Sequence, residues 1–387
     1  MTSKKRRRGT VKITGDKLIA ALESAISSQG SAELAILHLF NSYDFHLADL
    51  QLLLQAKGLD ISFSNIPYRD IAPRVGLDPL LKGNDMQAFD IHRARIPTAL
   101  FKAIVEDLGI VMNQYGEPRD HKNEEARSRF LAPLFNRTVA LFKLTIVNTP
   151  ESMIYGRITT RGRIKYYFLV FGRLSILVIE VKYKLGDADE RLDAIAQVIA
   201  ECDACDHAND RAGFHSFPIY AVLCDGITFE FFSFNGKTAQ PTFSRGVFRL
   251  PNAEPIETLA VGIYGSNTNA EFIFSLRPIC ETLFYFLLLA YRTGIEAYME
   301  RSVACGSRDN RPRESTPGWK EAHALACNAL TLAVEAGAKA ANRDEAANEK
   351  TEEALRCLQE SLAAIPASHR RDIDLMRSWD EERVEFC

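Results

Sequence analysis

The chain lacks any uninterrupted apolar run near the roughly 18–20 residues that a membrane-spanning helix needs. The longest candidate, Leu283–Tyr291, covers nine residues and is more typical of a buried helix in a globular protein. The N-terminus is basic and no apolar stretch follows it, so we expect no signal peptide and no association with a membrane.

A strong charge imbalance and a glycine-rich phosphate loop are also missing. The net charge is -3, so any role with nucleic acid would have to rest on local basic patches. Neither the Walker A pattern nor Gly-x-Gly-x-x-Gly occurs, which leaves nucleotide hydrolysis and dinucleotide binding unsupported. The eight cysteines are scattered over 387 residues, a distribution that favours reduced thiols inside a cell.

Composition, together with the positions of proline, glycine and polar stretches, divides the chain into five predicted regions. Residues 1–16 should be a basic disordered tail, and 17–115 a mostly helical region with a loop at 62–76 and a helix at 97–108. Residues 116–301 should form the core, and 302–318 a polar linker. The C-terminal region, 319–387, is predicted to contain a helical hairpin broken near Asn342.

The tail contains a run of five cations beside a glycine. These residues are Lys4, Lys5, Arg6, Arg7 and Arg8. Such a run predicts a nuclear localisation signal, with a phosphate-binding arm and a merely solvated tail as alternatives. We therefore expect the protein in the nucleus.

The core is expected to be of the α/β class, a mixed sheet flanked by helices. It should open on a helix at 123–140, with Asn123 as its N-cap and a bend or break at Pro133. Strands are predicted at 143–147, 154–159, 164–171 and 176–182, then a helix at 187–206. Two further strands, 219–223 and 227–234, flank an Asp-Gly turn, and an apolar helix at 272–298 closes the unit.

The strand at 176–182 carries the most informative pattern. Five apolar residues predict a strand buried on both faces, and its end places Glu180 and Lys182 on the same side of the sheet. A buried strand does not place a carboxylate and an ammonium together without a compensating interaction. This end of the strand is therefore a candidate site.

This E-x-K pattern, together with Glu124 on the opening helix and Gln197 on the next helix, resembles the PD-(D/E)XK (restriction-endonuclease-like) nuclease superfamily. From Asn123 to Phe234 the chain is similar to fungal members such as the nuclease-like domains of Crinkler-type effectors, although the Crinkler N-terminal targeting motif is absent. The resemblance implies a restriction-endonuclease-like core. It also implies catalytic roles for Glu124, Glu180, Lys182 and Gln197, with Mg²⁺ as the cofactor of an active enzyme.

One position departs from that family's pattern. The second motif should end in an Asp, but Lys165 stands in its place after Gly162-Arg163-Ile164. An ammonium repels Mg²⁺ and removes a ligand, so a weakened or inactive site is expected. Between Ala126 and Ile179 the one acidic residue is Glu151, which makes Glu180 and Glu151 the predicted metal ligands.

Cations concentrate in the strands that precede Glu180. A nucleic-acid-binding surface is predicted from Arg157, Arg161, Arg163, Lys165, Arg173 and Lys184. In the resembling family this face approaches the scissile strand, so phosphate binding without a metal is a coherent interpretation. The alternative is a set of solvated cations that protect a sheet edge.

Three functions follow from these patterns. The first is a degenerate nuclease fold that binds nucleic acid, most simply DNA, through the basic strands. The second is an active Mg²⁺-dependent DNA endonuclease. The third is a nuclear effector or adaptor that acts through protein contacts, for which the apolar stripes of the C-terminal helices would offer a surface for a partner or for self-association.

Overall fold

The computed structural model describes residues 62–370, except for 160–161, 187, 216, 237–239, 250–253, 263–268 and 309–316, together with Ser24. Contacts divide the chain after Ile61, and the fold below is that of the unit Ser62–Cys387. The predicted basic tail with Lys4–Arg8, the helices expected between 17 and 61 and residues 309–316 of the predicted linker lie outside the described residues. The first residues of the predicted linker, 302–308, belong instead to a helix that ends at Arg308.

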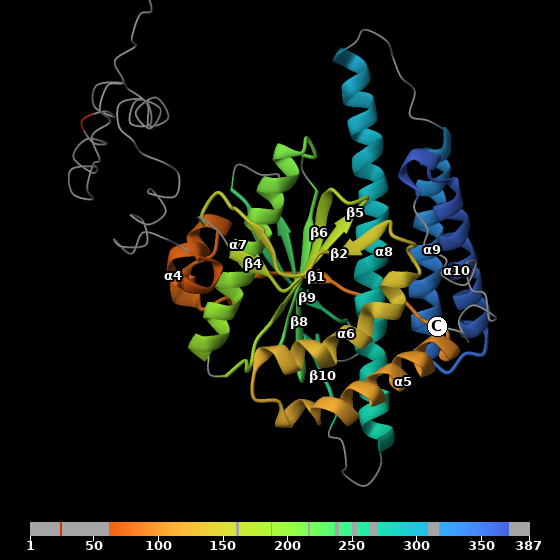
Figure 1. Cartoon of the computed structure of the whole chain (residues 1–387), viewed down its shortest axis with the longest axis horizontal. Coiled ribbons are helices and arrows are strands. Elements are labelled where there is room, and N and C mark those ends of the chain that lie inside the picture. Colours follow the sequence, from red (N-terminus) through yellow and green to blue (C-terminus); the bar gives the residue numbers. More distant parts are fainter. Residues whose placement is uncertain are drawn as a thin grey trace, which may run out of the picture. The chain divides into compact units, whose positions relative to one another are not determined.

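A mixed eight-stranded sheet forms the centre of this unit (Figure 1). Its strands are β1 (Gln87–Asp90), β2 (Ile146–Asn148), β5 (Tyr166–Val170), β6 (Leu174–Val181), β7 (Ile219–Cys224), β8 (Thr228–Asn235), β9 (Thr242–Val247) and β10 (Thr258–Ala260). The order across the sheet is β1-β9-β8-β7-β6-β5-β2, with β10 paired to β8. The pairs β6–β7 and β1–β9 are parallel and the others antiparallel. Strands β3 (Ser152–Ile154) and β4 (Gly162–Ile164) form a separate antiparallel pair.

Helices cover both faces of the sheet. On one face α5 (Thr98–Tyr115), α6 (Glu124–Ala140), α8 (Asn269–Arg308), α9 (Pro317–Ala341) and α10 (Ala346–Ala364) share one hydrophobic cluster. On the other face α4 (Tyr68–Ile71) and α7 (Ala188–Arg211) share a second. The short 3-10 turns are η1 (Phe63–Asn65), η2 (Ala72–Val75), η3 (Pro79–Leu81), η4 (Pro118–Asp120) and η5 (Ala367–His369). The result is a three-layered α/β/α arrangement.

The central strand β6 is buried along all eight of its residues, as its apolar sequence predicts. Its side chains alternate between the layers, since Ile179 belongs to the α8-side cluster and Val178 to the α7-side cluster. Glu180 therefore points to the same layer as Val178 and faces α7. This alternation is what positions the candidate site.

The helices predicted on described residues are present, with ends that differ by up to ten residues, since α5 continues to Tyr115 and α8 to Arg308. Helix α6 begins as expected, because the side chain of Asn123 accepts a hydrogen bond from the amide of Ala126 at 2.8 Å. Pro133 lies inside α6, which continues through it to Ala140. The hairpin of α9 and α10 turns at 342–345, as predicted near Asn342.

The strands were predicted less well. Residues 155–159, expected in a strand, follow β3 without strand structure, and β1, β9 and β10 were not predicted. The predicted loop at 62–76 contains η1, α4 and η2 instead. Strand β1 joins the sheet edge beside β9, so the segment before residue 116 contributes to the same core.

The long helix α8 packs against one face of the sheet (Figure 1). By length and composition its residues Asn269–Arg301 could cross a membrane, with a mean hydropathy of 1.6 in the most apolar window. However, 72% of that window is buried inside the protein. Burial of this extent is typical of the core helix of a globular fold.

Candidate functional site

The end of β6 places two of the predicted catalytic residues beside α7. The backbone amide of Lys182 donates to the carbonyl of Cys224 at 2.9 Å, which fixes the chain just beyond the strand against β7. The side chain of Glu180 is 6% exposed, and its Oε1 lies 3.1 Å from the Lys182 Nζ. The ammonium thus compensates the buried carboxylate.

Gln197 joins these two side chains from α7. Its Nε2 donates to Glu180 Oε1 at 2.7 Å, while its Oε1 accepts a hydrogen bond from Lys182 Nζ. The amide therefore satisfies both charged groups with one planar side chain. Burial raises the pKa of Glu180, and the charge of Lys182 offsets part of that rise.

A fourth side chain, Glu201, belongs to this network and was missed in the sequence. It is fully buried, one helical turn after Gln197, and its Oε1 accepts from Gln197 Nε2 at 2.9 Å. Its Oε2 is buried without a hydrogen-bond partner among the described residues. Burial and then the charge of Glu180 raise the pKa of Glu201 well above the ordinary value, so Glu201 is the member of the pair that retains a proton. The four-residue spacing from Gln197 was the signal available in the sequence.

An open pocket of about 430 Å³ lies beside this network. Its lining comes from η1, the start of α6, the segment after β6 and the first turns of α7. The lining residues are Ser64, Glu124, Lys182, Tyr183, Lys184, Glu190, Asp193, Ala194 and Gln197. Glu124 is exposed at the first position of α6, and its charge contributes to the raised pKa of Glu180. The structure thus brings Glu124, Lys182 and Gln197 together around one pocket, with Glu180 directly behind them.

Lys165 lies at the bend between β4 and β5, and its side chain is bound by two carboxylates away from Glu180. The next residue, Tyr166, pairs with Ile179 in the β5–β6 ladder, so Lys165 lies just beyond the end of that ladder. Its Nζ lies 2.8 Å from Glu125 Oε2 and 3.0 Å from Glu151 Oε1. Burial lowers the pKa of Lys165, but these two carboxylates outweigh it, so the net shift is upward and the ammonium stays charged.

This arrangement also places Glu151, the predicted substitute metal ligand. Glu151 is bound to Lys165 and does not line the pocket. Mg²⁺ commonly uses one or two protein carboxylates and completes its shell with water and substrate phosphate. Glu124 lines the pocket, whereas Glu180 lies behind it with its Oε1 already bound by Lys182 and Gln197, so the residues fit the ion only in part. Within the described ranges no group of three or more His, Cys, Asp or Glu side chains could hold a metal.

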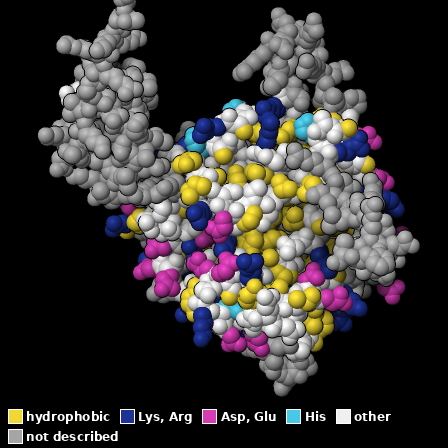
Figure 2. Space-filling view, in the orientation of Figure 1, with side chains coloured by type: hydrophobic (Ala, Val, Ile, Leu, Met, Phe, Trp, Pro, Cys, Tyr) yellow, Lys and Arg dark blue, Asp and Glu magenta, His cyan; other side chains and the backbone are white. Residues whose placement is uncertain are grey.

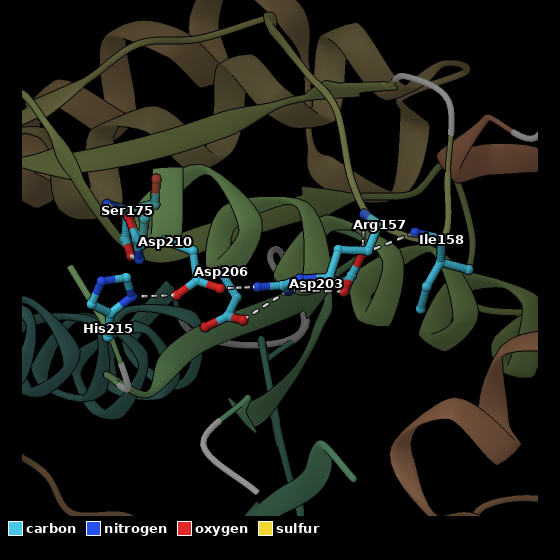
Figure 3. A network of polar contacts seen from close by, with 8 residues as sticks. Arg157, Ile158, Ser175, Asp203, Asp206, Asp210 and His215 are labelled. Atoms are coloured by element: carbon cyan, nitrogen blue, oxygen red, sulfur yellow. Dashed lines mark hydrogen bonds and ion pairs between the residues drawn. The ribbon is translucent and has the colours of Figure 1, made fainter. Parts of the chain in front are cut away.

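Arg157, one of the predicted nucleic-acid contacts, is committed to an internal ion cluster (Figure 3). Its guanidinium lies 2.9 Å from Asp206 and 3.3 Å from Asp203, and it also pairs with Asp210. Its backbone amide donates to Asp203 Oδ2 at 2.8 Å. This arginine clamps the loop after β3 onto α7 and its positive charge is already neutralised.

The remaining predicted cations do not form one surface. Arg163 is exposed on β4, whereas Arg173 lies at the turn before β6, about 23 Å along the strand from Glu180. Lys184 lines the pocket, and Arg161 lies outside the described residues. On the side of the molecule shown in Figure 2, cations and carboxylates are interspersed over the described residues. Of these predicted cations Lys184 lines the pocket, whereas Arg163 and Arg173 do not.

The apolar stripes of the C-terminal helices, predicted as a possible partner surface, are used inside the molecule. Leu330, Leu358 and Leu362 are buried in the α8-side cluster, and Leu332, Val334 and Leu355 pack against it. The hydroxyl of Tyr291 on α8 lies 2.9 Å from Ser361 Oγ on α10. These contacts make the C-terminal hairpin part of the core.

Comparison with known proteins adds no assignment. No family model matches the chain, and no curated protein matches it.

Proposed function

We propose that this chain is a nucleic-acid-directed protein of nuclease-like fold, with a weakened phosphodiester site in the pocket beside Glu180. One observation carries the proposal. Helix α6, the segment just after β6 and helix α7 bring Glu124, Lys182 and Gln197 to the lining of a single open pocket, and Glu180 of β6 is bound behind it to Lys182 and Gln197. Two carboxylates, an ammonium and an amide in this arrangement suit the handling of a phosphate ester.

The topology supports the finer assignment to a restriction-endonuclease-like core. Helix α6 is followed by an antiparallel meander of β2, β5 and β6, then by α7 and the parallel strand β7. The same order of helix, three strands, helix and strand is implied by the sequence resemblance. The pair β3–β4 is an insertion between β2 and β5 in this interpretation.

The charges of the pocket favour a phosphate that is accompanied by a cation. Glu124, Glu190 and Asp193 outnumber Lys182 and Lys184 along the lining. A bare phosphodiester would meet net repulsion there, since like charges at short range repel even in a hydrated site. Glu124 and Glu180 would hold Mg²⁺, which when bound supplies positive charge at the phosphoryl oxygen.

The chain's own groups then have distinct tasks. Lys182 donates toward a phosphate oxygen or an attacking water, while Gln197 orients its ammonium and the Glu180 carboxylate together. Glu201, neutral behind Gln197, keeps the buried layer from carrying a second negative charge. Lys165 remains bound to Glu125 and Glu151, so neither of these two carboxylates is offered to the pocket as a metal ligand. The site should bind better than it cleaves.

The test measures cleavage and binding of labelled single- and double-stranded DNA with Mg²⁺, Mn²⁺, Ca²⁺ or EDTA. We expect salt-sensitive binding that strengthens with divalent cations, and slow cleavage with Mg²⁺ or Mn²⁺. Glu180→Ala and Lys182→Ala should lower the cleavage rate by a factor on the order of 100. Lys320→Ala, an exposed lysine on α9, serves as the matched control and should have no effect.

Three other results would each contradict the proposal and favour a different function. Fast metal-dependent cleavage abolished by both substitutions would make the chain an active Mg²⁺-dependent endonuclease. Binding that is unchanged in EDTA, with no cleavage, would make it a metal-independent binding module. If neither DNA binds at any salt concentration, a protein-contact role such as an adaptor becomes the better account.

A further inference from the structure

An exposed aromatic ring stands in the pocket between its two lysines. Tyr183 is 46% exposed and lines the pocket with Lys182 and Lys184. Neither the hydrolytic nor the metal-binding chemistry assigned above uses this ring.

The ring rests on a buried guanidinium. The Cζ of Arg127 lies 5.2 Å from the centroid of the Tyr183 ring, and Arg127 is itself 5% exposed. This arginine donates from Nη1 to the carbonyl of Asp225, in the turn between β7 and β8. A cation on one face leaves the opposite face of the ring for another planar group.

The segment that carries Tyr183 is fixed on both sides. The amide of Lys182 donates to the carbonyl of Cys224 at 2.9 Å, and the amide of Leu185 lies 3.3 Å from Asp225 Oδ2. The same carboxylate caps its own turn through the amides of Ile227 and Thr228. The ring is thus held on a prepared backbone, which lowers the entropy lost when a ligand stacks on it.

We propose that Tyr183 is a stacking platform for an unpaired nucleobase, so that the pocket selects single-stranded nucleic acid or a splayed end over an intact duplex. Every base has a flat π face that stacks on an aromatic side chain, whereas the faces of a paired base are covered by its neighbours in the helix. The flanking Lys182 and Lys184 would contact the phosphates on either side of the stacked base. This inference rests on the proposed function and names the substrate class of the same site.

The test compares three ligands by fluorescence anisotropy in Ca²⁺. They are a labelled single-stranded DNA of mixed sequence, the same strand with abasic spacers at its centre, and the matching duplex. Wild type should bind the intact single strand most tightly. Tyr183→Ala should weaken that binding roughly five- to hundredfold and leave the abasic strand almost unaffected. Tyr183→Phe should retain the wild-type affinity, because the hydroxyl is not needed for stacking.

The fluorescence of 2-aminopurine reports base stacking directly and gives a second readout. A 2-aminopurine base in the single strand should be quenched on binding to wild type and to Tyr183→Phe, but not to Tyr183→Ala. Tyr155→Ala is the matched control, since Tyr155 is a tyrosine of similar exposure, 51% against 46%, that does not line the pocket. Thermal unfolding of each variant verifies that the fold is retained.

Different results would contradict the stacking role of Tyr183 and the proposed nucleic-acid-directed function. If wild type binds both strands and duplex equally, and Tyr183→Ala binds like wild type, the stacking inference is wrong while the proposed function stands. If wild type binds none of the three ligands, the proposed function fails and the inference fails with it.

Discussion

At the scale of single residues, Glu201 links the site to the pH dependence of stability. Its pKa is raised in the folded protein by burial and by Glu180, so the folded chain holds a proton that the unfolded chain loses near pH 4.5. The unfolded state therefore binds fewer protons above that pH, and the free energy of unfolding falls as the pH rises. We expect Glu201→Gln to make this fall smaller and to leave the variant at least as stable as wild type at pH 8.

Urea unfolding at pH 5 and pH 8 measures the effect. The control is Glu352→Gln on the exposed face of α10, which should keep the wild-type dependence. An identical pH dependence in wild type and Glu201→Gln would show that Glu201 is not the group that carries the proton.

Arg157 offers a second residue-scale prediction, because its cluster with three aspartates assigns it to stability rather than to DNA. Removing it leaves Asp203 and Asp206 buried without their cation. We expect Arg157→Ala to lower the free energy of unfolding by about 1–3 kcal/mol, with DNA affinity of the folded protein unchanged. Arg163→Ala, an exposed arginine of the same region, should change neither quantity.

Denaturant titration and anisotropy on the same samples test this prediction. A loss of DNA affinity in Arg157→Ala without a loss of stability would return Arg157 to the nucleic-acid surface predicted from sequence.

The residues of the site were predictable to different degrees. Glu180 and Lys182 follow from charges at the end of an apolar strand, and Gln197 from its place on the next helix. Glu201 was missed because burial of a lone carboxyl gives no sequence signal beyond its helical spacing. The pairing of Arg157 with α7 joins residues 46 to 53 positions apart, which no local pattern reveals.

At the scale of elements, the start of α6 fixes Glu124. Asn123 caps the helix through the amide of Ala126, so the direction of the first turn depends on that side chain. Asn123→Ala should cost about 1 kcal/mol of stability and also weaken DNA binding, because Glu124 loses its fixed position at the pocket. Asn123→Asp retains the capping oxygen and should keep the wild-type stability. Urea unfolding and fluorescence anisotropy of both variants test this prediction. Wild-type stability and DNA affinity in Asn123→Ala would show that the cap neither stabilises α6 nor positions Glu124.

The elements themselves were predictable where local sequence determines them. Strand β6 is apolar except for Ser175 and Glu180. The turn after β7 suits a hairpin, because the Asp225 side chain accepts from the amide of Thr228 and Gly226 has a positive φ of 80°. Strand β1 has only four residues, with an exposed pattern, and pairs with β9 more than 150 positions later. Such a strand is stabilised by its partner rather than by its own sequence, so it could not be predicted locally.

At the scale of the whole unit Ser62–Cys387, the segment that follows β1, the sheet and the C-terminal hairpin share one core. The amide of Arg95 donates to the carbonyl of Ala333 on α9 at 2.9 Å, and the buried Glu281 on α8 binds Arg93, Arg95 and Arg277. This carboxylate thus ties the segment after β1 to α8, while α9 contacts the same segment through its backbone. Docking of the hairpin should therefore be cooperative with folding of the sheet.

Gly337 of α9 is the residue that permits this docking. A Cβ added at Gly337 would lie 2.1 Å from the carbonyl oxygen of Arg93, a backbone atom that cannot move aside without shifting the segment. Alanine favours a helix by about 1 kcal/mol over glycine, but the clash should outweigh that gain. We expect Gly337→Ala to lower the free energy of unfolding by about 1–3 kcal/mol.

Gly109 supplies the matched control, since a Cβ added there on α5 would meet nothing within 4 Å. Gly109→Ala should raise stability by up to about 1 kcal/mol through helix propensity alone. Because the hairpin shares the core, Gly337→Ala should unfold in a single transition at lower urea, seen equally by tryptophan fluorescence, to which Trp319 of α9 contributes, and by circular dichroism. Separate transitions, with the sheet unfolding at the wild-type urea concentration, would show that the C-terminal hairpin is an independent domain.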